Sequence, residues 1–106
     1  MVVRGEVWYA RLDPTEGREI RKTRPCLVVS PPEIHDYLDI VTVVPLTSGS
    51  RPAAYRIPAR FKGKSGFILT EQIRTLDKAR LSRKLGRIDD ATLSEVLRTL
   101  REAFTA

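Results

Sequence analysis

Arginine, hydroxyl and carboxylate side chains stand at three points where a polar stretch meets an apolar run. Arg24 precedes the second apolar run of the chain, Thr47 follows the third, and Glu71 follows the run at 67–69. An arginine can neutralise a phosphate, a hydroxyl can donate to a non-bridging oxygen, and a carboxylate can take the proton of a 2′-hydroxyl. If the three positions converge on one rim of a small curled sheet, they could cleave RNA by internal transesterification without a metal ion.

Each of these positions also has a purely structural interpretation. Arg24 can be a surface cation beside Pro25, which fixes its own φ and extends the residue before it. Thr47 and Ser48 can be turn residues, and Glu71 can pair with a nearby lysine or arginine. The residues alone leave both interpretations open.

The positive charge of the chain is concentrated in its body. The net charge is +6, but residues 1–88 carry 17 Lys/Arg against 9 Asp/Glu, whereas residues 89–106 carry 2 against 4. A basic small domain indicates a nucleic acid or an acidic protein as partner. A solvated cationic surface would have the same composition.

Several chemistries are disfavoured by the residues present. The single cysteine, Cys26, excludes an internal disulfide and argues against zinc, and we expect it to be a small core residue. The single histidine, His35, excludes a two-histidine ribonuclease mechanism, and we expect it in an exposed turn. Without a P-loop or a G-x-G-x-x-G motif, no cofactor is expected. No stretch has the apolar length of a membrane span, so we expect a cytoplasmic protein.

Short runs of strand-forming residues separated by turn residues predict one mainly β domain over 1–106. A charged loop over 13–24 is long for so small a domain, which favours a functional role and exposure. The expected strands are 7–12, 26–30, 40–46, 55–58, 67–69, 72–76 and 85–88, with a short helical turn at 78–81.

A terminal helix over 90–104 is the clearest single element. Asp89 is a suitable N-cap, and apolar residues at helical spacing form one stripe from Leu93 to Phe104, for core or interface packing. Strands followed by one helix predict a small curled sheet or barrel closed by that helix.

Five segments in order resemble the MazF/PemK-like toxins of bacterial toxin–antitoxin systems. They are 4–8 (RGEVW), 12–19 (LDPTEGRE), 22–25 (KTRP), 44–48 (VPLTS) and 71–81 (EQIRTLDKARL). The resemblance spans nearly the whole chain. It implies an SH3-like barrel with a C-terminal helix, acting as a homodimer. It also implies a metal-independent endoribonuclease that cuts single-stranded RNA at short sequences and leaves a 2′,3′-cyclic phosphate and a 5′-hydroxyl.

The resemblance also implies a cognate antitoxin, whose disordered tail would cover the RNA site. We expect that tail to be acidic, because the body of the chain is basic. The expected catalytic residues are Arg24, Thr47, Glu19 and Glu71. The expected RNA-binding residues are Lys22, Ser48, Gln72, Arg18 and Arg74. Some family members use a histidine in the first loop; this chain has none there, so that variant of the mechanism does not carry over.

The role of Arg24 follows from its chemistry. An arginine rarely gives up its proton, because its pKa lies above about 12. Arg24 is therefore expected to stabilise the charged phosphorane, with Glu19 or Glu71 as the base. The alternative function is a non-catalytic binding protein, either a gyrase-poisoning toxin of the CcdB class or an RNA-binding barrel. The CcdB class is expected to carry a tryptophan at the end of its terminal helix, where this chain has Phe104.

Overall fold

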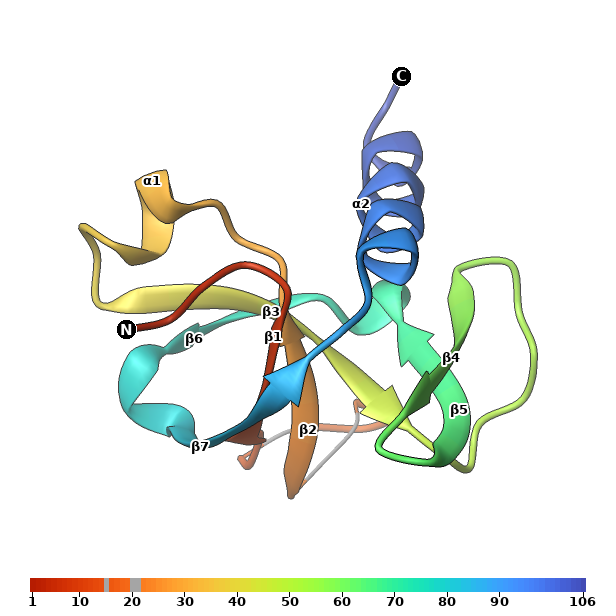
Figure 1. Ribbon diagram of the computed structural model, residues 1–106, viewed down its shortest axis with the longest axis horizontal. Coiled ribbons are helices and arrows are strands. Elements are labelled where there is room, and N and C mark those ends of the chain that lie inside the picture. Colours follow the sequence, from red (N-terminus) through yellow and green to blue (C-terminus); the bar gives the residue numbers. More distant parts are fainter. Residues whose placement is uncertain (15, 20–21) are drawn as a thin grey trace.

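The computed structural model describes residues 1–14, 16–19 and 22–106 (Figure 1). Among the helices of these residues, none is long and apolar enough to cross a membrane. The elements in chain order are β1 (Glu6–Arg11), β2 (Thr23–Val28), α1 (Pro32–His35), β3 (Ile40–Thr47), β4 (Arg56–Phe61), β5 (Lys64–Leu69), the 3-10 turn η1 (Thr70–Gln72), β6 (Arg74–Asp77), the 3-10 turn η2 (Lys78–Arg80), β7 (Leu81–Arg87) and α2 (Asp90–Ala103).

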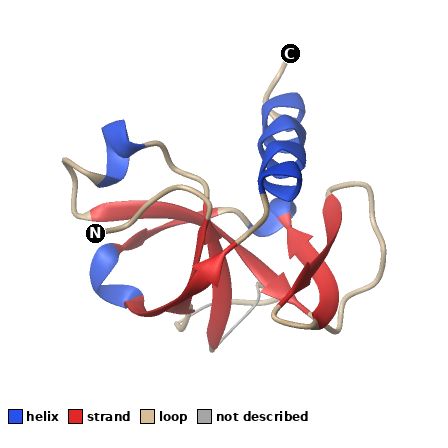
Figure 2. Cartoon of the chain, viewed as in Figure 1, coloured by secondary structure: helices blue, strands red, loops and turns tan. Residues whose placement is uncertain are grey.

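The strands form one antiparallel sheet in the order β4-β5-β3-β2-β1-β7, and β6 also pairs with β3. Strands dominate the molecule, with α2 standing on one side of the sheet (Figure 2). The expected mainly β fold with a C-terminal helix is thus confirmed. In the described chain no ladder joins β4 to β7, so the sheet curls without closing into a complete barrel.

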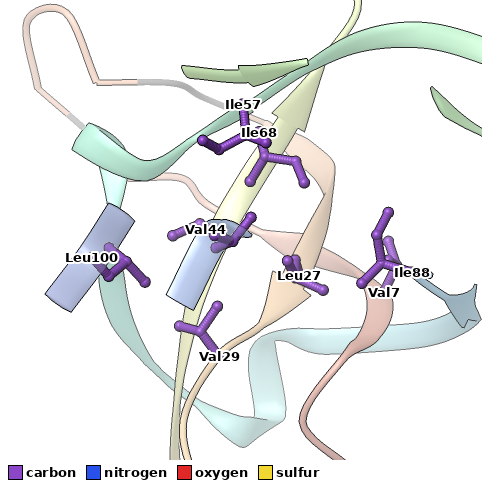
Figure 3. Close-up of a cluster of buried hydrophobic side chains, with 9 residues drawn as sticks. Val7, Leu27, Val29, Val44, Ile57, Ile68, Ile88 and Leu100 are labelled. Carbon is purple, nitrogen blue, oxygen red and sulfur yellow. The ribbon is translucent and has the colours of Figure 1, made fainter. Parts of the chain in front are cut away.

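Strand β2 is buried on both faces, which explains its continuous apolar run. Leu27 points into a core with Val44, Ile68 and, from α2, Val96 (Figure 3 shows this cluster). The residues on either side of Leu27 point the other way, into a second core. That core consists of Ala10, Leu12, Cys26, Val28, Val41, Val43 and Leu76.

Helix α2 follows the predicted bounds closely. The Asp89 carboxylate accepts the backbone N–H of Thr92 at 3.0 Å, as an N-cap should. The stripe packs from Leu93 to Leu100 against the first core, but Phe104 lies past the last turn and is 74% exposed. The apolar stripe is therefore core over most of its length.

The expected exposure of His35 is wrong. Pro32 begins the short helix α1, since proline suits the first helical position. The turn folds His35 inward, where it is 1% exposed and its Nδ1 lies 2.9 Å from the Oγ of Ser30. Its imidazole therefore fills a buried polar site.

Strands β4 and β5 are joined by a two-residue turn. Phe61 pairs with Lys64, and the residues between them have positive φ, 49° at Lys62 and 79° at Gly63. This is the pattern of a type I′ turn, whose twist matches that of the flanking strands. Glycine adopts the left-handed region freely, whereas in a lysine it costs about 1–2 kcal/mol.

Candidate active site

Arg24 and Thr47 meet at the same end of the β2–β3 pair. Cys26 pairs with Pro45, and residues two apart on a strand point to the same face of the sheet. Arg24 lies two residues before Cys26 and Thr47 two residues after Pro45, so both are at the same end and on the same face. Arg24 was expected just before the strand, but it lies within β2, which starts at Thr23.

Both residues line one cavity of about 500 Å³, and Ser48 lines it with them. The Thr47 Oγ1 accepts the backbone N–H of Gly49 at 3.2 Å. That bond uses a lone pair of the hydroxyl and leaves its proton free to donate. The sheet has thus brought a guanidinium and an available hydroxyl donor to one opening.

Gly66 makes this end of β3 possible. It lies on β5 beside Thr47, and a Cβ on Gly66 would overlap the carbonyl oxygen of Thr47. Only glycine allows the two backbones to approach this closely. The position of the Thr47 hydroxyl therefore depends on a residue of a different strand.

The loop between β1 and β2 is closed at its base by the backbone N–H of Leu12, which donates to the carbonyl of Lys22 at 2.9 Å. Lys22 and Arg18 are exposed. Glu19 reaches back to the sheet, where an Oε2 lies 3.7 Å from an Nη2 of Arg74 on β6. Residues 15, 20 and 21 of this loop lie outside the described residues.

The Glu19–Arg74 contact lies on the same face of the sheet as Arg24. Arg74 pairs in register with Val43, whose side chain belongs to the second core with Cys26. Burial raises the pKa of the Cys26 thiol to about 12, and the nearby charge of Arg74 lowers it only in part. Cys26 is thus a protonated core thiol at neutral pH, and the loop carboxylate lies on its side of the sheet.

Glu71 is placed differently. It lies on η1, where its Oε2 accepts from Nε of Arg56 at 2.9 Å and lies 2.8 Å from Nη2 of the same arginine. Neither Glu71 nor its neighbour Gln72 is among the described lining of the cavity. The structure therefore brings Arg24, Thr47 and Ser48 together, while Glu71 has the ion-pair partner that its structural interpretation requires.

Three cavity cations were not anticipated from the sequence: Lys62, Lys64 and Arg83. Lys62 and Lys64 fell between the expected strands at 55–58 and 67–69, and Arg83 fell outside the expected strand at 85–88. In the part of the chain that the structure describes, no three His, Cys, Asp or Glu side chains gather where they could hold a metal ion.

Known proteins resemble this chain in sequence and share its architecture. The family model of the PemK-like, MazF-like toxins of type II toxin–antitoxin systems matches residues 3–104. Endoribonuclease PemK of Escherichia coli is 37% identical over 108 residues, which cover 96% of this chain and 81% of that protein. Endoribonuclease MazF of Staphylococcus epidermidis is 35% identical over 104 residues, 91% and 85% of the two chains.

The solved structures agree. MazF of Deinococcus radiodurans superposes with a TM-score of 0.86 at 25% identity, covering 96% of this chain and 94% of that one. A mycobacterial endoribonuclease, solved in complex with its cognate antitoxin, has the same fold, with a TM-score of 0.81 at 24% identity over 97% and 94% of the two chains. The chain therefore belongs to the PemK-like, MazF-like toxin family of type II toxin–antitoxin systems.

Proposed function

We propose that this protein is a sequence-specific endoribonuclease toxin that cleaves single-stranded RNA without a metal ion. The observation that carries the proposal is the meeting of Arg24 and Thr47 on one cavity, in a chain whose relatives are named endoribonucleases. Because its substrate is cellular RNA, the enzyme acts in the cytoplasm.

In the proposed reaction the 2′-oxygen of a ribose attacks the adjacent phosphorus. The new bond joins O2′ to phosphorus, and the bond from phosphorus to O5′ breaks. The products are a 2′,3′-cyclic phosphate and a 5′-hydroxyl, whose proton comes from water. Arg24 stabilises the dianionic phosphorane, and the Thr47 hydroxyl donates to a non-bridging oxygen.

The proton of the 2′-hydroxyl goes to a carboxylate, and the geometry favours Glu19 over Glu71 for this step. Glu19 comes from the loop on the Arg24 side of the sheet and lies 3.7 Å from its arginine partner. Glu71 is held by two closer contacts to Arg56. Neither carboxylate is among the described lining of the cavity, so the preference rests on the looser contact of Glu19 and on its side of the sheet. Lys22, Arg18 and Arg74 would contact RNA phosphates, and Ser48 and Gln72 would contact the strand beside them.

A cognate antitoxin would neutralise the enzyme, and the active species would be a homodimer. The support is the family membership, the basic body of the chain and the mycobacterial relative solved with its antitoxin. An acidic, disordered antitoxin tail would bind less tightly as salt is added.

The test is a cleavage assay on long single-stranded RNA in excess EDTA, followed by mapping of the new 5′ ends. We expect cleavage to persist in EDTA and the 5′ ends to share a short sequence. Arg24→Ala should slow cleavage by about 10²–10³, the usual cost of removing one preorganised donor. Arg60→Ala, which removes an exposed charge from strand β4, is the matched control.

Loss of cleavage in EDTA, or normal cleavage by Arg24→Ala, would contradict the mechanism. Intact RNA with every variant would favour the alternative, a non-catalytic binding protein of the CcdB class or an RNA-binding barrel. The lone tryptophan does not support the CcdB alternative, since Trp8 lies on β1 and donates its Nε1 proton to Glu6 at 3.1 Å.

A further inference from the structure

The cavity that holds Arg24 and Thr47 extends well beyond them, under the β4–β5 hairpin and across to β7. Its far side is formed by Phe61, Lys62 and Lys64 of the hairpin and by Arg83 and Leu85 of β7. The two sides belong to strands at opposite edges of the open sheet. The failure of the sheet to close thus leaves a cavity of about 500 Å³, which is the size of a small-molecule site.

The lining is strongly cationic. Besides Arg24 it contains Lys62, Lys64 and Arg83, and the described lining residues include no carboxylate. Across residues 1–14, 16–19 and 22–106, no carboxylate lies within ion-pair distance of these three side chains, whereas Arg56 and Lys84 nearby in the fold each have one. Cations gathered around a cavity without counter-charges favour an anionic ligand.

Aromatic surface lies between the charges. Tyr9, Phe61 and Phe67 line the same cavity, and the guanidinium of Arg83 lies over the Tyr9 ring, 5.2 Å from its centroid. Alternation of aromatic rings with cations is how proteins bind single-stranded nucleic acid, because bases stack on the rings while phosphates meet the charges.

The backbone conformation of Lys62 is further evidence for an anionic ligand. Asparagine or glycine is preferred at this position of a type I′ turn, yet the chain has a lysine at φ 49°. Its side chain turns toward β7, with Cε 3.7 Å from the place that a Cβ on Gly86 would take. A residue held in an unfavourable conformation at the edge of a cavity is a candidate for ligand binding.

We propose that this cavity receives the nucleotide next to the cleaved bond, with Lys62 and Lys64 on its phosphate and the aromatic lining against its base. The proposal rests on the proposed function, since it takes RNA as the substrate. It extends the RNA path from Arg24 and Thr47 into the gap between β4 and β7. It also assigns a specificity-determining role to the β4–β5 hairpin.

The test is a binding measurement with a fluorescent, mixed-sequence 2′-O-methylated RNA, which cannot be cleaved at a 2′-hydroxyl. Lys62→Asn should weaken binding about three- to tenfold at low salt and reduce the slope of log K against log salt by about 0.7, the value for one lost phosphate contact on a single strand. Its melting temperature should stay equal or rise, because asparagine suits the turn. A variant that melts at an equal or higher temperature and yet binds RNA more weakly has not lost binding through a loss of stability.

Arg60→Asn is the matched control. It removes the same charge from the same hairpin, but Arg60 alternates with Ala59 and Phe61 and lies outside the cavity lining. Lys64→Ala is the second variant, expected to weaken binding as Lys62→Asn does. Equal losses for Lys62→Asn, Lys64→Ala and Arg60→Asn would overturn the proposal.

A second binding measurement uses adenosine monophosphate in place of the RNA. If Lys62→Asn weakens binding of the mononucleotide but not of the RNA, the cavity holds a free nucleotide and the proposal fails. If the wild type cleaves RNA while Lys62→Asn binds normally, this site is wrong and the proposed enzyme stands. If RNA binding depends on Lys62 but no RNA is cleaved, the cavity binds RNA in a non-catalytic protein, and both the proposed enzyme and the placement of this site beside a cleaved bond fail.

Discussion

The charges on helix α2 and the charges around the cavity are arranged in opposite ways. On α2, Arg98 contacts both Glu95 and Glu102, the latter at 2.7 Å, and hydrogen bonding from Arg98 lowers the pKa of Glu95. Around the cavity, Lys62 and Lys64 have no carboxylate within ion-pair distance among the described residues. The helix charges pair with one another, whereas Lys62 and Lys64 have no paired carboxylate among the described residues and are available to a ligand.

This difference offers a way to sort charges by role. A charge paired within its own element is expected to act on stability, and only slightly if it is exposed. A charge without an internal partner, placed on a cavity, is expected to act on binding and rate. The change at Arg98 below tests the paired side of that distinction directly, and the other changes separate effects on rate from effects on stability.

The largest effect is expected at the two candidate bases. Glu19→Gln should slow cleavage by about 10²-fold or more, because a positioned general base typically contributes 10²–10⁴. Glu71→Gln should leave the rate nearly unchanged and lower the melting temperature, because its carboxylate holds Arg56. Single-turnover cleavage and thermal unfolding of the same two variants would measure both. The reverse pattern would make Glu71 the base.

The next effect is on stability alone and tests the helix side. Leu100 is 9% exposed and packs in the core beneath α2, so Leu100→Ala should lower the free energy of unfolding by about 2–3 kcal/mol. Urea denaturation would measure the loss. Below the unfolding transition, RNA cleavage should stay within about threefold of the wild type, since a difference of that size is under 1 kcal/mol. A large loss of rate in the folded variant would show that packing beneath α2 also sets the rate of cleavage.

A smaller, pH-dependent effect is expected at Glu6. Burial raises the pKa of Glu6, but hydrogen bonds from Trp8, Val3 and Lys84 together bring it below its ordinary value. Its contribution to stability is therefore present above the unfolded pKa, about 4.3, and is lost as the pH falls through the lower folded pKa. Glu6→Gln should be less stable than the wild type at pH 7, with the gap narrowing below pH 4.3. A gap that is constant with pH would show that packing, not charge, makes the difference.

The smallest effect is expected at Arg98. Its ion pairs are exposed, and such pairs add little to stability because water and salt screen them. Arg98→Ala should change neither the RNA affinity nor, beyond a slight decrease, the melting temperature. RNA binding that falls as far as in Lys62→Asn would show that pairing within the chain does not identify a structural charge.

The sequence predicted elements best where side-chain periodicity was intact. Helix α2 shows one clear stripe and a cap at Asp89, so its position followed directly. Strand β7 was predicted only at its end, because Ser82, Arg83 and Lys84 give a polar run and bulges interrupt its register with β1 at two places. The exposure of His35 depended on a proline-started turn that folds inward, which no local pattern indicates.

The part of the candidate site that depends on a single strand pair could be predicted from the sequence. Arg24 lies on β2 and Thr47 on β3, and these two strands pair directly, so their meeting needs only one ladder. The cavity cations could not be predicted from one strand pair. Lys62 and Arg83 come together only when the curl of the sheet brings its two edges toward each other. The pairing of Glu71 with Arg56 likewise depends on the β4–β5 ladder reaching η1.

Cys26 provides a natural probe of local opening at the proposed active site. Its thiol is fully buried and protonated at neutral pH, two residues from Arg24 on the same strand. A thiol reagent can reach it only when β2 separates from its neighbours, so the labelling rate measures how often that happens. Bound RNA or antitoxin that holds these strands together would slow the labelling. A single natural cysteine would thus follow inhibition in the unmodified toxin, without an attached probe.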